Sequence, residues 1–178
     1  MIFIETNLRG AYLIEPEKLE DKRGFFARSF CVKEFKKHGL NPRLVQCNIS
    51  FNAKEGTLRG MHYQKAPCAE AKLVRCTRGA LHDVIVDLRP DSPTFKVHFG
   101  IQLDESNRLM LYIPEGFAHG FITMKDNSEI FYQMSEFYSP QHAAGFRWND
   151  PSFGIQWPTE IQVISERDRT YPDFETAV

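Results

Sequence analysis

The sequence predicts an all-β fold, a barrel or sandwich of short strands with short flanking helices. From residue 45 onward, short β segments are separated by turn residues at intervals of about 8–12 residues. Residues 81–88 place Val84 and Val86 on one face and Asp83 and Asp87 on the other, which is the period-two pattern of a half-buried strand. Many short strands with little helix are typical of a sandwich or barrel.

The N-terminal region, residues 1–45, is expected to add short strands and one short helix to the same domain. Strands are predicted at 2–4 and 12–14, and a polar turn leads into an aromatic strand within 21–26. The apolar residues of 31–35 lie at helical spacing, and Gly39 follows a cationic turn. This pattern predicts a short helix that glycine ends.

The rest of the chain reads as strands followed by an irregular tail. The C-terminal segment 148–178 has prolines at positions 151, 158 and 172, so it allows only a turn or two of helix around 165–168 and is expected to wrap the barrel. One domain spanning residues 1–178 is therefore expected, with the N-terminal strands and the C-terminal wrap as parts of it. The individually predicted strands from residue 72 onward are 72–76, 81–88, 95–103, 109–113, 120–124 and 129–137.

The charge balance argues against nucleic acid or a membrane surface as a partner. The chain has 22 basic and 23 acidic residues among 178, so no global field attracts nucleic acid or a membrane surface, and an anionic ligand requires a local cluster. No apolar stretch reaches a membrane-spanning length. Cys31, Cys47, Cys68 and Cys76 show no C-x-x-C spacing, and the first residues lack the features of a signal peptide. We expect reduced thiols in a cytoplasmic protein.

Two histidines have the spacing of the two half-motifs of a cupin barrel. His62 follows a glycine by six residues and His119 follows a proline by five, so two strands are expected to direct imidazoles into one cavity. A metal-binding cupin usually has another histidine two residues after the first, but that position is Gln64 here. The remaining ligands would be His62, His119 and at most Glu70, a set that favours a metal-free pocket of titratable groups in which His62 is free to act as a base.

Eight sequence segments, spread over nearly the whole chain, carry a family resemblance. They are DxRGxF (21–26), QxN (46–48), LRGMHYQ (58–64), AKLV (71–74), DVxVDLRxxSPTF (83–95), IPEGFAHGF (113–121), WNDP (148–151) and SERD (165–168). In type and order these segments resemble the dTDP-4-dehydrorhamnose 3,5-epimerase family. The resemblance implies a cupin jelly-roll barrel, a homodimer, no metal and no other cofactor. It also implies epimerisation of a nucleotide-linked 4-keto-6-deoxy sugar at C3, C5 or both.

The chemistry of that reaction explains the catalytic residues that the resemblance implies. A proton beside a ketone is removed only if a base lies within hydrogen-bond reach and a donor or cation stabilises the enolate oxygen. Inversion then needs a proton from the opposite face. By family position, His62 resembles the base, Asp168 the carboxylate that orients it, Lys72 the cation near the keto oxygen and Tyr132 the acid on the other face.

The resemblance also implies substrate-binding positions, but it does not determine which nucleotide and sugar are bound. The family usually has glutamate at positions 28 and 143, where this chain has Arg28 and Ala143, and these changes alter the donors that a ligand must present. We expect dTDP-4-dehydro-6-deoxyglucose to be converted to dTDP-4-dehydrorhamnose, although the nucleotide or sugar could differ. The positions that match contacts to the nucleotide diphosphate, the base or the sugar are Arg23, Phe26, Arg28, Gln46, Asn48, Arg59, His119 and Tyr138.

Structural roles and other functions remain open beside this interpretation. Asp168 could belong to a capping box that begins at Ser165, Lys72 could be a solvated strand lysine, and at least one of Tyr132 and Tyr138 could pack in the core. The alternative functions are a ketoisomerase or single-centre epimerase on another sugar nucleotide, a metal-dependent cupin enzyme, and a sugar-nucleotide binder without activity.

Overall fold

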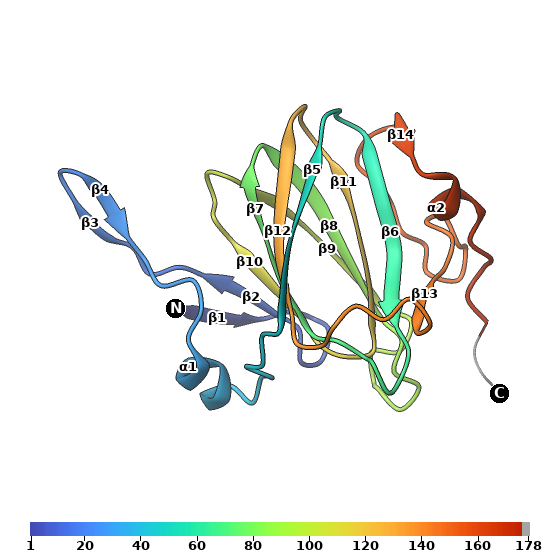
Figure 1. The fold of residues 1–178 in the computed structure, drawn as a ribbon, viewed down its shortest axis with the longest axis horizontal. Helices are drawn as coiled ribbons and strands as arrows, with labels where there is room; N and C mark the ends of the chain where they lie inside the picture. Colours follow the sequence, from blue (N-terminus) through green and yellow to red (C-terminus); the bar gives the residue numbers. More distant parts are fainter. Residues whose placement is uncertain (176–178) are drawn as a thin grey trace.

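The computed structural model describes residues 1–175, which form two facing β-sheets, a projecting hairpin and two short helices (Figure 1). The first sheet contains, in spatial order, β1 (Ile2–Glu5), β2 (Tyr12–Glu15), β10 (Met110–Ile113), β7 (Lys72–Arg78), β12 (Ser128–Met134) and β5 (Gln46–Asn52). The second contains β13 (Ala143–Gly145), β6 (Thr57–Gln64), β11 (Phe117–Thr123), β8 (Ala80–Asp87) and β9 (His98–Asp104), with β14 (Val163–Ile164) parallel to β6. This arrangement confirms the all-β prediction.

The main hydrophobic core fills the space between the two sheets. Successive strand residues point to opposite faces, so on β7 Val74 and Cys76 enter this core, while Leu73 packs on the other face with Phe35. Complete burial of one such apolar side chain contributes about 1.5–3 kcal/mol. The buried core residues that face each other from the two sheets include Val74, Leu111, Ile113 and Ile130 on the first and Leu81, Ile85, Leu103, Phe117 and Phe121 on the second.

The N-terminal region supplies the edge strands β1 and β2, the helix α1 (Val32–Lys37) and the hairpin of β3 (Leu19–Asp21) and β4 (Gly24–Phe26). The predicted helix is confirmed, and Gly39 follows it with a φ of 70°. Figure 1 shows the hairpin projecting away from both sheets. Its apolar side chains are not covered by the chain itself, since Leu19 is 69% and Phe26 71% exposed.

The prediction that residues 81–88 form a half-buried strand is wrong. β8 lies between β11 and β9, and the side chains of both Asp83 and Asp87 are completely buried. Buried carboxylates require hydrogen-bond partners. Asp83 bonds to His119, and Asp87 is the centre of a polar cluster.

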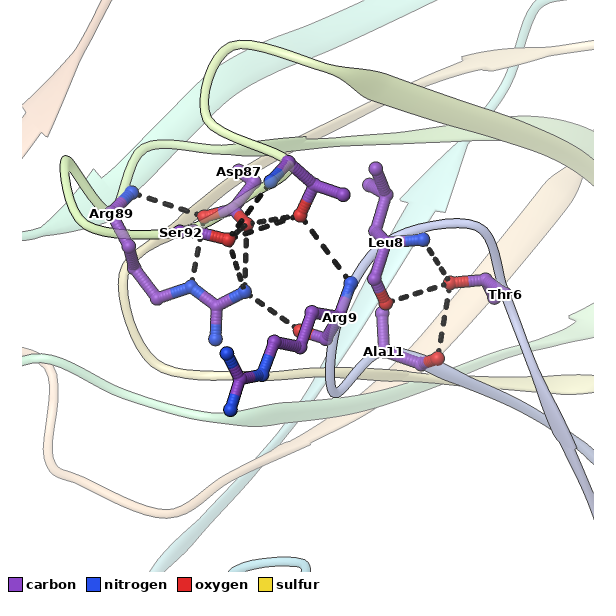
Figure 2. Close-up of polar contacts among 8 residues, drawn as sticks. Thr6, Leu8, Arg9, Ala11, Asp87, Arg89 and Ser92 are labelled. Carbon is purple, nitrogen blue, oxygen red and sulfur yellow. Dashed lines mark hydrogen bonds and ion pairs between the residues drawn. The ribbon is translucent and has the colours of Figure 1, made fainter.

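The cluster around Asp87 joins the loop between β1 and β2 to the loop between β8 and β9 (Figure 2). The Asp87 carboxylate accepts hydrogen bonds from Arg89 Nε at 2.8 Å, Arg89 Nη2 at 2.7 Å, Ser92 Oγ at 2.5 Å and Thr94 Oγ1 at 2.7 Å. Arg89 Nη2 also donates to the carbonyl oxygen of Arg9 at 2.7 Å. Burial alone raises the pKa of Asp87, but the bonds from Arg89, Ser92 and Thr94 outweigh it and hold the pKa below its usual value.

Part of the C-terminal segment lies along β6, while residues 176–178 of the predicted wrap lie outside the described residues. β14 pairs with Thr57 and Leu58, and the five-residue helix α2 (Glu166–Thr170) follows it directly, where the sequence predicts a turn or two of helix (Figure 1). Across residues 1–175, no helix combines the length and apolar character that a membrane span requires.

Candidate active site

A cavity of about 400 Å³ lies between the two sheets and is lined by residues of both. Its walls come from β5, β7 and β12 of the first sheet, β6, β11 and β13 of the second, and α2. Three of the four predicted catalytic residues line it, and the fourth, Asp168, lies behind His62. The sequence-predicted site residues that line this cavity are His62, Lys72, Tyr132, Gln46, Asn48, Arg59, His119 and Tyr138.

The two cupin-type histidines lie on neighbouring strands, which confirms that both imidazoles reach one cavity. His62 of β6 and His119 of β11 are register partners. The strands approach each other closely beside this pair, where a Cβ added to Gly60 would lie 2.5 Å from Gly120 Cα. Glycine at both positions therefore permits the packing that brings the histidines together.

His62 and Asp168 form a tight hydrogen-bonded pair. His62 Nε2 lies 2.6 Å from Asp168 Oδ1, and Asp168 Oδ2 accepts a 3.3 Å bond from Gly60 N. An ionised carboxylate can only accept, so Nε2 carries the proton of this bond, and in the neutral imidazole the lone pair is then on Nδ1. Asp168 is 4% exposed, and burial raises its pKa, but the hydrogen bond and charge of His62 more than offset this, so its pKa lies below the usual value. This geometry suits a histidine base with an orienting carboxylate.

Asp168 also takes part in the helix cap that the sequence suggested as an alternative. Ser165 is the N-cap of α2, and its Oγ accepts a 3.1 Å bond from the backbone N of Asp168. The carboxylate of Asp168 is directed to His62 and Gly60 rather than back to the cap. The cap therefore begins the short helix that presents the carboxylate, and the two interpretations are compatible.

Lys72 and Tyr132 lie on adjacent strands of the first sheet. Lys72 is 8% exposed, and its Nζ lies 2.8 Å from Glu70 Oε1, so the alternative of a solvated strand lysine is wrong. Tyr132 is half-buried on β12 and packs partly against the core while it lines the cavity. Its pKa is raised chiefly by burial, with a smaller contribution from the charge of Glu70 that Arg59 opposes, so the phenol remains protonated at neutral pH.

A second histidine–carboxylate pair lies beside the first. His119 Nε2 is 2.9 Å from Asp83 Oδ2, and the Asp83 side chain is completely buried. The sequence analysis placed Asp83 only on the polar face of a strand. Its partnership with His119 follows from the register of β8 against β11, which no local sequence signal encodes.

Gln64, which occupies the position of the missing cupin histidine, is engaged by backbone groups. Its Nε2 donates to Cys68 O at 2.8 Å and to Phe137 O at 3.2 Å, and its Oε1 accepts from Ser139 N at 2.6 Å. The amide thus joins two loops at the cavity. Within the described residues, no group of three or more histidine, cysteine, aspartate or glutamate side chains is placed to hold a metal ion.

Two arginines contribute further polar groups to the cavity wall. Arg59 Nε donates to Asn52 Oδ1 at 2.7 Å, which fixes its guanidinium on β6. Arg167 of α2 also lines the cavity, and its Nε donates to Tyr171 OH at 2.7 Å. The sequence analysis did not assign Arg167, although it is the third residue of the SERD segment. It also missed Ser50, whose buried Oγ lines the cavity without a hydrogen-bond partner.

Three predicted substrate-binding residues do not line the cavity of their own chain. Arg23 and Phe26 belong to the β3–β4 hairpin, which projects from the sheets (Figure 1). The side chain of Arg23 bonds to Asp21. Arg28 follows the hairpin, and its Nη1 bonds to Glu34 at 2.6 Å. Their substrate contacts remain predictions.

Comparisons with known proteins agree on one family. The family model for dTDP-4-dehydrorhamnose 3,5-epimerase matches residues 5–176. A relative of that name from Sinorhizobium fredii (strain NBRC 101917 / NGR234) is 44% identical over 175 residues, which cover 98% of this chain and 90% of the relative. The dTDP-4-dehydrorhamnose 3,5-epimerase structure from Elizabethkingia anophelis NUHP1 has a TM-score of 0.95 and 39% identity, covering 98% of this chain and 96% of that one. The Bacillus anthracis structure, with TDP and PPi bound, has a TM-score of 0.93 and 43% identity, covering 97% and 99%. This chain therefore belongs to the dTDP-4-dehydrorhamnose 3,5-epimerase family, which confirms the cupin jelly-roll fold and the isomerase class predicted from its sequence.

Proposed function

We propose that the chain epimerises a nucleotide-linked 4-keto-6-deoxy sugar, with dTDP-4-dehydro-6-deoxyglucose as substrate and dTDP-4-dehydrorhamnose as product. The observation that carries this proposal is the 2.6 Å His62–Asp168 pair at the same cavity as Lys72 and Tyr132. A base, a cation and an acid are the three groups that proton transfer beside a ketone requires.

The four catalytic residues account for every proton in the reaction. His62 Nδ1 takes the proton from the carbon beside the keto group, and the C–H electron pair moves into the enolate. Asp168 stabilises the imidazolium, and the ammonium of Lys72 stabilises the enolate oxygen. Tyr132 then donates its hydroxyl proton to the opposite face of the carbon. Afterwards His62 releases the abstracted proton to solvent and Tyr132 takes one up from solvent. The net result is inversion without oxidation or reduction.

The nucleotide diphosphate is assigned to the cationic part of the cavity. Arg59 and Arg167 both line it, and a guanidinium can bind a phosphate with two parallel hydrogen bonds. The buried Oγ of Ser50 offers a further donor in the same cavity. Ala143 also lines the cavity, so the nucleotide meets a methyl group where the family usually presents a carboxylate.

The homodimer is part of the same proposal, because the site assigned from the sequence is incomplete within one chain. Arg23, Phe26 and Arg28 are exposed and lie outside the cavity. Further apolar side chains are uncovered on the edge strand β5, where Ile49 is 66% and Phe51 48% exposed. Exposed apolar surface of this kind marks protein interfaces. A two-fold pairing that covers it would allow each hairpin to reach the cavity of the other subunit.

NMR in deuterated buffer tests the proposed reaction carbon by carbon. The purified chain is incubated with dTDP-4-dehydro-6-deoxyglucose, and we expect deuterium with inversion at C3 and C5. Inversion at a single carbon would make the chain a single-centre epimerase, and movement of the carbonyl would make it a ketoisomerase. Binding of the sugar nucleotide without any exchange would overturn the proposal in favour of a binding protein.

A further inference from the structure

Glu70 is a buried carboxylate at the cavity whose second oxygen has no partner. The residue is 6% exposed, lines the cavity and lies two residues before Lys72. Its Oε1 is 2.8 Å from Lys72 Nζ, while Oε2 is buried and makes no hydrogen bond. Leaving a buried acceptor unsatisfied costs about 1–3 kcal/mol, and more when the group is charged. Such an atom in a folded protein calls for a specific explanation.

The other buried oxygens without a hydrogen-bond partner also lie at or next to the cavity. Among the described residues, the buried side-chain oxygens without a partner are Ser50 Oγ, Glu70 Oε2 and Asp83 Oδ1. Ser50 and Glu70 line the cavity, and Asp83 holds His119 at its wall. These unsatisfied groups are therefore concentrated where a polar ligand would bind.

The chemistry of Oε2 defines the ligand group that it would take. A carboxylate oxygen only accepts hydrogen bonds, so its partner must be a donor such as a hydroxyl. The other oxygen of the same carboxylate holds Lys72, to which the proposed mechanism assigns the keto oxygen. In a 4-keto sugar, the hydroxyl nearest to that oxygen is on the adjacent carbon C3. An ammonium and a carboxylate held side by side therefore match a ketone and its neighbouring hydroxyl.

We propose that Glu70 is a positioning and specificity-determining residue, which holds Lys72 through Oε1 and accepts a hydrogen bond from the C3 hydroxyl of the sugar through Oε2. This inference rests on the proposed epimerase function and extends it to the class of sugar: the site selects 4-keto sugars that carry a free hydroxyl beside the ketone. Such a pair of contacts fixes the rotation of the sugar ring above His62.

The test compares two substrates in two proteins. The substrates are dTDP-4-dehydro-6-deoxyglucose and its 3-deoxy analogue, and the readout is deuterium exchange and inversion at C5, which both sugars allow. Glu70→Gln keeps a carbonyl oxygen for Lys72 but places an amide NH2, which cannot accept, at the position of Oε2. For the native protein we expect KM for the 3-deoxy analogue to be about 10- to 100-fold higher than KM for the hydroxylated sugar. This is the effect expected from the loss of one hydrogen bond to a charged group.

The variant should lose this discrimination. With Glu70→Gln, KM for the hydroxylated sugar should rise toward that for the 3-deoxy sugar, while KM for the 3-deoxy sugar changes little. Equal losses on both sugars would overturn the inference and leave Glu70 as a counter-ion of Lys72 only. Equal KM values for the two sugars in the native protein would also overturn it, and that measurement does not depend on the variant folding.

Two controls separate this inference from the function on which it rests. Glu136→Gln removes a carboxylate that bonds to Arg43 outside the cavity, and it should leave both KM values unchanged. Binding of dTDP, which lacks the sugar, should be the same in the native protein and in Glu70→Gln. A native protein that exchanges neither sugar would overturn the proposed function itself, whereas an active native protein without discrimination at C3 overturns only the role of Glu70.

Discussion

At the scale of single residues, Asp168 joins a helix cap to a proposed catalytic pair. Asp168→Asn keeps the backbone bond to Ser165 but replaces a carboxylate, which can only accept, with an amide. The amide would stabilise the wrong tautomer of His62 and would no longer stabilise its imidazolium form. We expect deuterium exchange to fall about 10²- to 10⁴-fold, and His62→Ala to abolish exchange at every ring carbon. Both effects are measured by NMR in deuterated buffer.

The matched control for this prediction is Ser165→Ala. It removes the cap while leaving the Asp168 carboxylate in place, and should cost about 1 kcal/mol of stability with a much smaller loss of rate. An Asp168→Asn protein that kept its rate but melted at a lower temperature would show that the cap is the main role of this residue.

Tyr132 separates proton removal from inversion. Tyr132→Phe keeps the ring that packs against the core and removes only the hydroxyl. Because His62 can still exchange a proton on one face, the variant should introduce deuterium with retained configuration while it forms about 10²- to 10⁴-fold less epimer. Equal losses of exchange and epimerisation would instead mean that the hydroxyl binds or positions the sugar.

Gln64 supports the expectation of metal-independent activity. Its amide is engaged by three backbone groups of the loops at the cavity, so it is not free to complete a ligand set with His62 and His119. We expect turnover to be unchanged after exhaustive chelation and dialysis. Loss of activity that one added transition metal restores would support the metal-dependent cupin alternative.

At the scale of secondary-structure elements, the Asp87 cluster holds two loops together. Asp87→Asn leaves its four side-chain donors with a weaker, uncharged partner, and we expect a loss of about 3 kcal/mol in the free energy of unfolding at pH 7. Because the folded pKa of Asp87 lies below its usual value, its contribution is present above about pH 4 and is lost as the pH falls through the folded pKa.

Urea unfolding at several pH values tests this assignment. The difference in stability between the native protein and Asp87→Asn should narrow as the pH falls below about 4, because the unfolded carboxylate is protonated there first, and the folded carboxylate only at lower pH. Asp91→Asn is the control, since Asp91 is exposed on the same loop, and it should change stability by less than about 0.5 kcal/mol. A difference that stayed constant with pH would contradict the electrostatic explanation.

The sequence predicts these elements well where the signal is local. It predicts them poorly where contacts with other elements decide the bounds or the burial of a strand. The strand predicted at 72–76 and the helix around 31–38 are present because their signals are continuous. β13 and β14, with three and two residues, are too short to show a period. β9 begins at His98 rather than at 95, because the turn bound to Asp87 continues to Lys96, whose φ is 64°. The alternation in β8 shows that its two faces differ, but not that the polar face is buried.

The same limit applies to the site. His62 and Lys72 were found because they lie in family segments, and Tyr132 was found by its family position; the structure brings all three to one cavity. The partnership of Asp83 with His119, and of Glu70 with Lys72, depends on which side chains the folded strands bring together. Sequence analysis considered Glu70 only as a metal ligand.

At the scale of the whole molecule, the projecting β3–β4 hairpin predicts a site shared between two subunits. If Arg23 and Phe26 act on the cavity of the partner subunit, a chain with Arg23→Ala and Phe26→Ala has an intact His62 but cannot complete its partner's site. A His62→Ala chain has the opposite defect. Co-expression of the two, each inactive alone, would form mixed dimers in which one cavity combines a native His62 with a native hairpin. Random assembly of two-fold dimers then restores about a quarter of the native number of sites.

Recovered epimerase activity in the co-expressed pair is the expected result, measured after tandem purification through two different tags. The control is co-expression of His62→Ala with Asp168→Asn, because both changes affect the same pair within one cavity, and no assembly of these chains contains an unaltered site. Recovery in the first pair but not in the second would place the hairpin in the partner's cavity. If neither pair recovers activity although mixed dimers are isolated, the hairpin acts on its own chain or not on the substrate at all. In the second case, its exposed Leu19 and Phe26 would contribute to assembly alone.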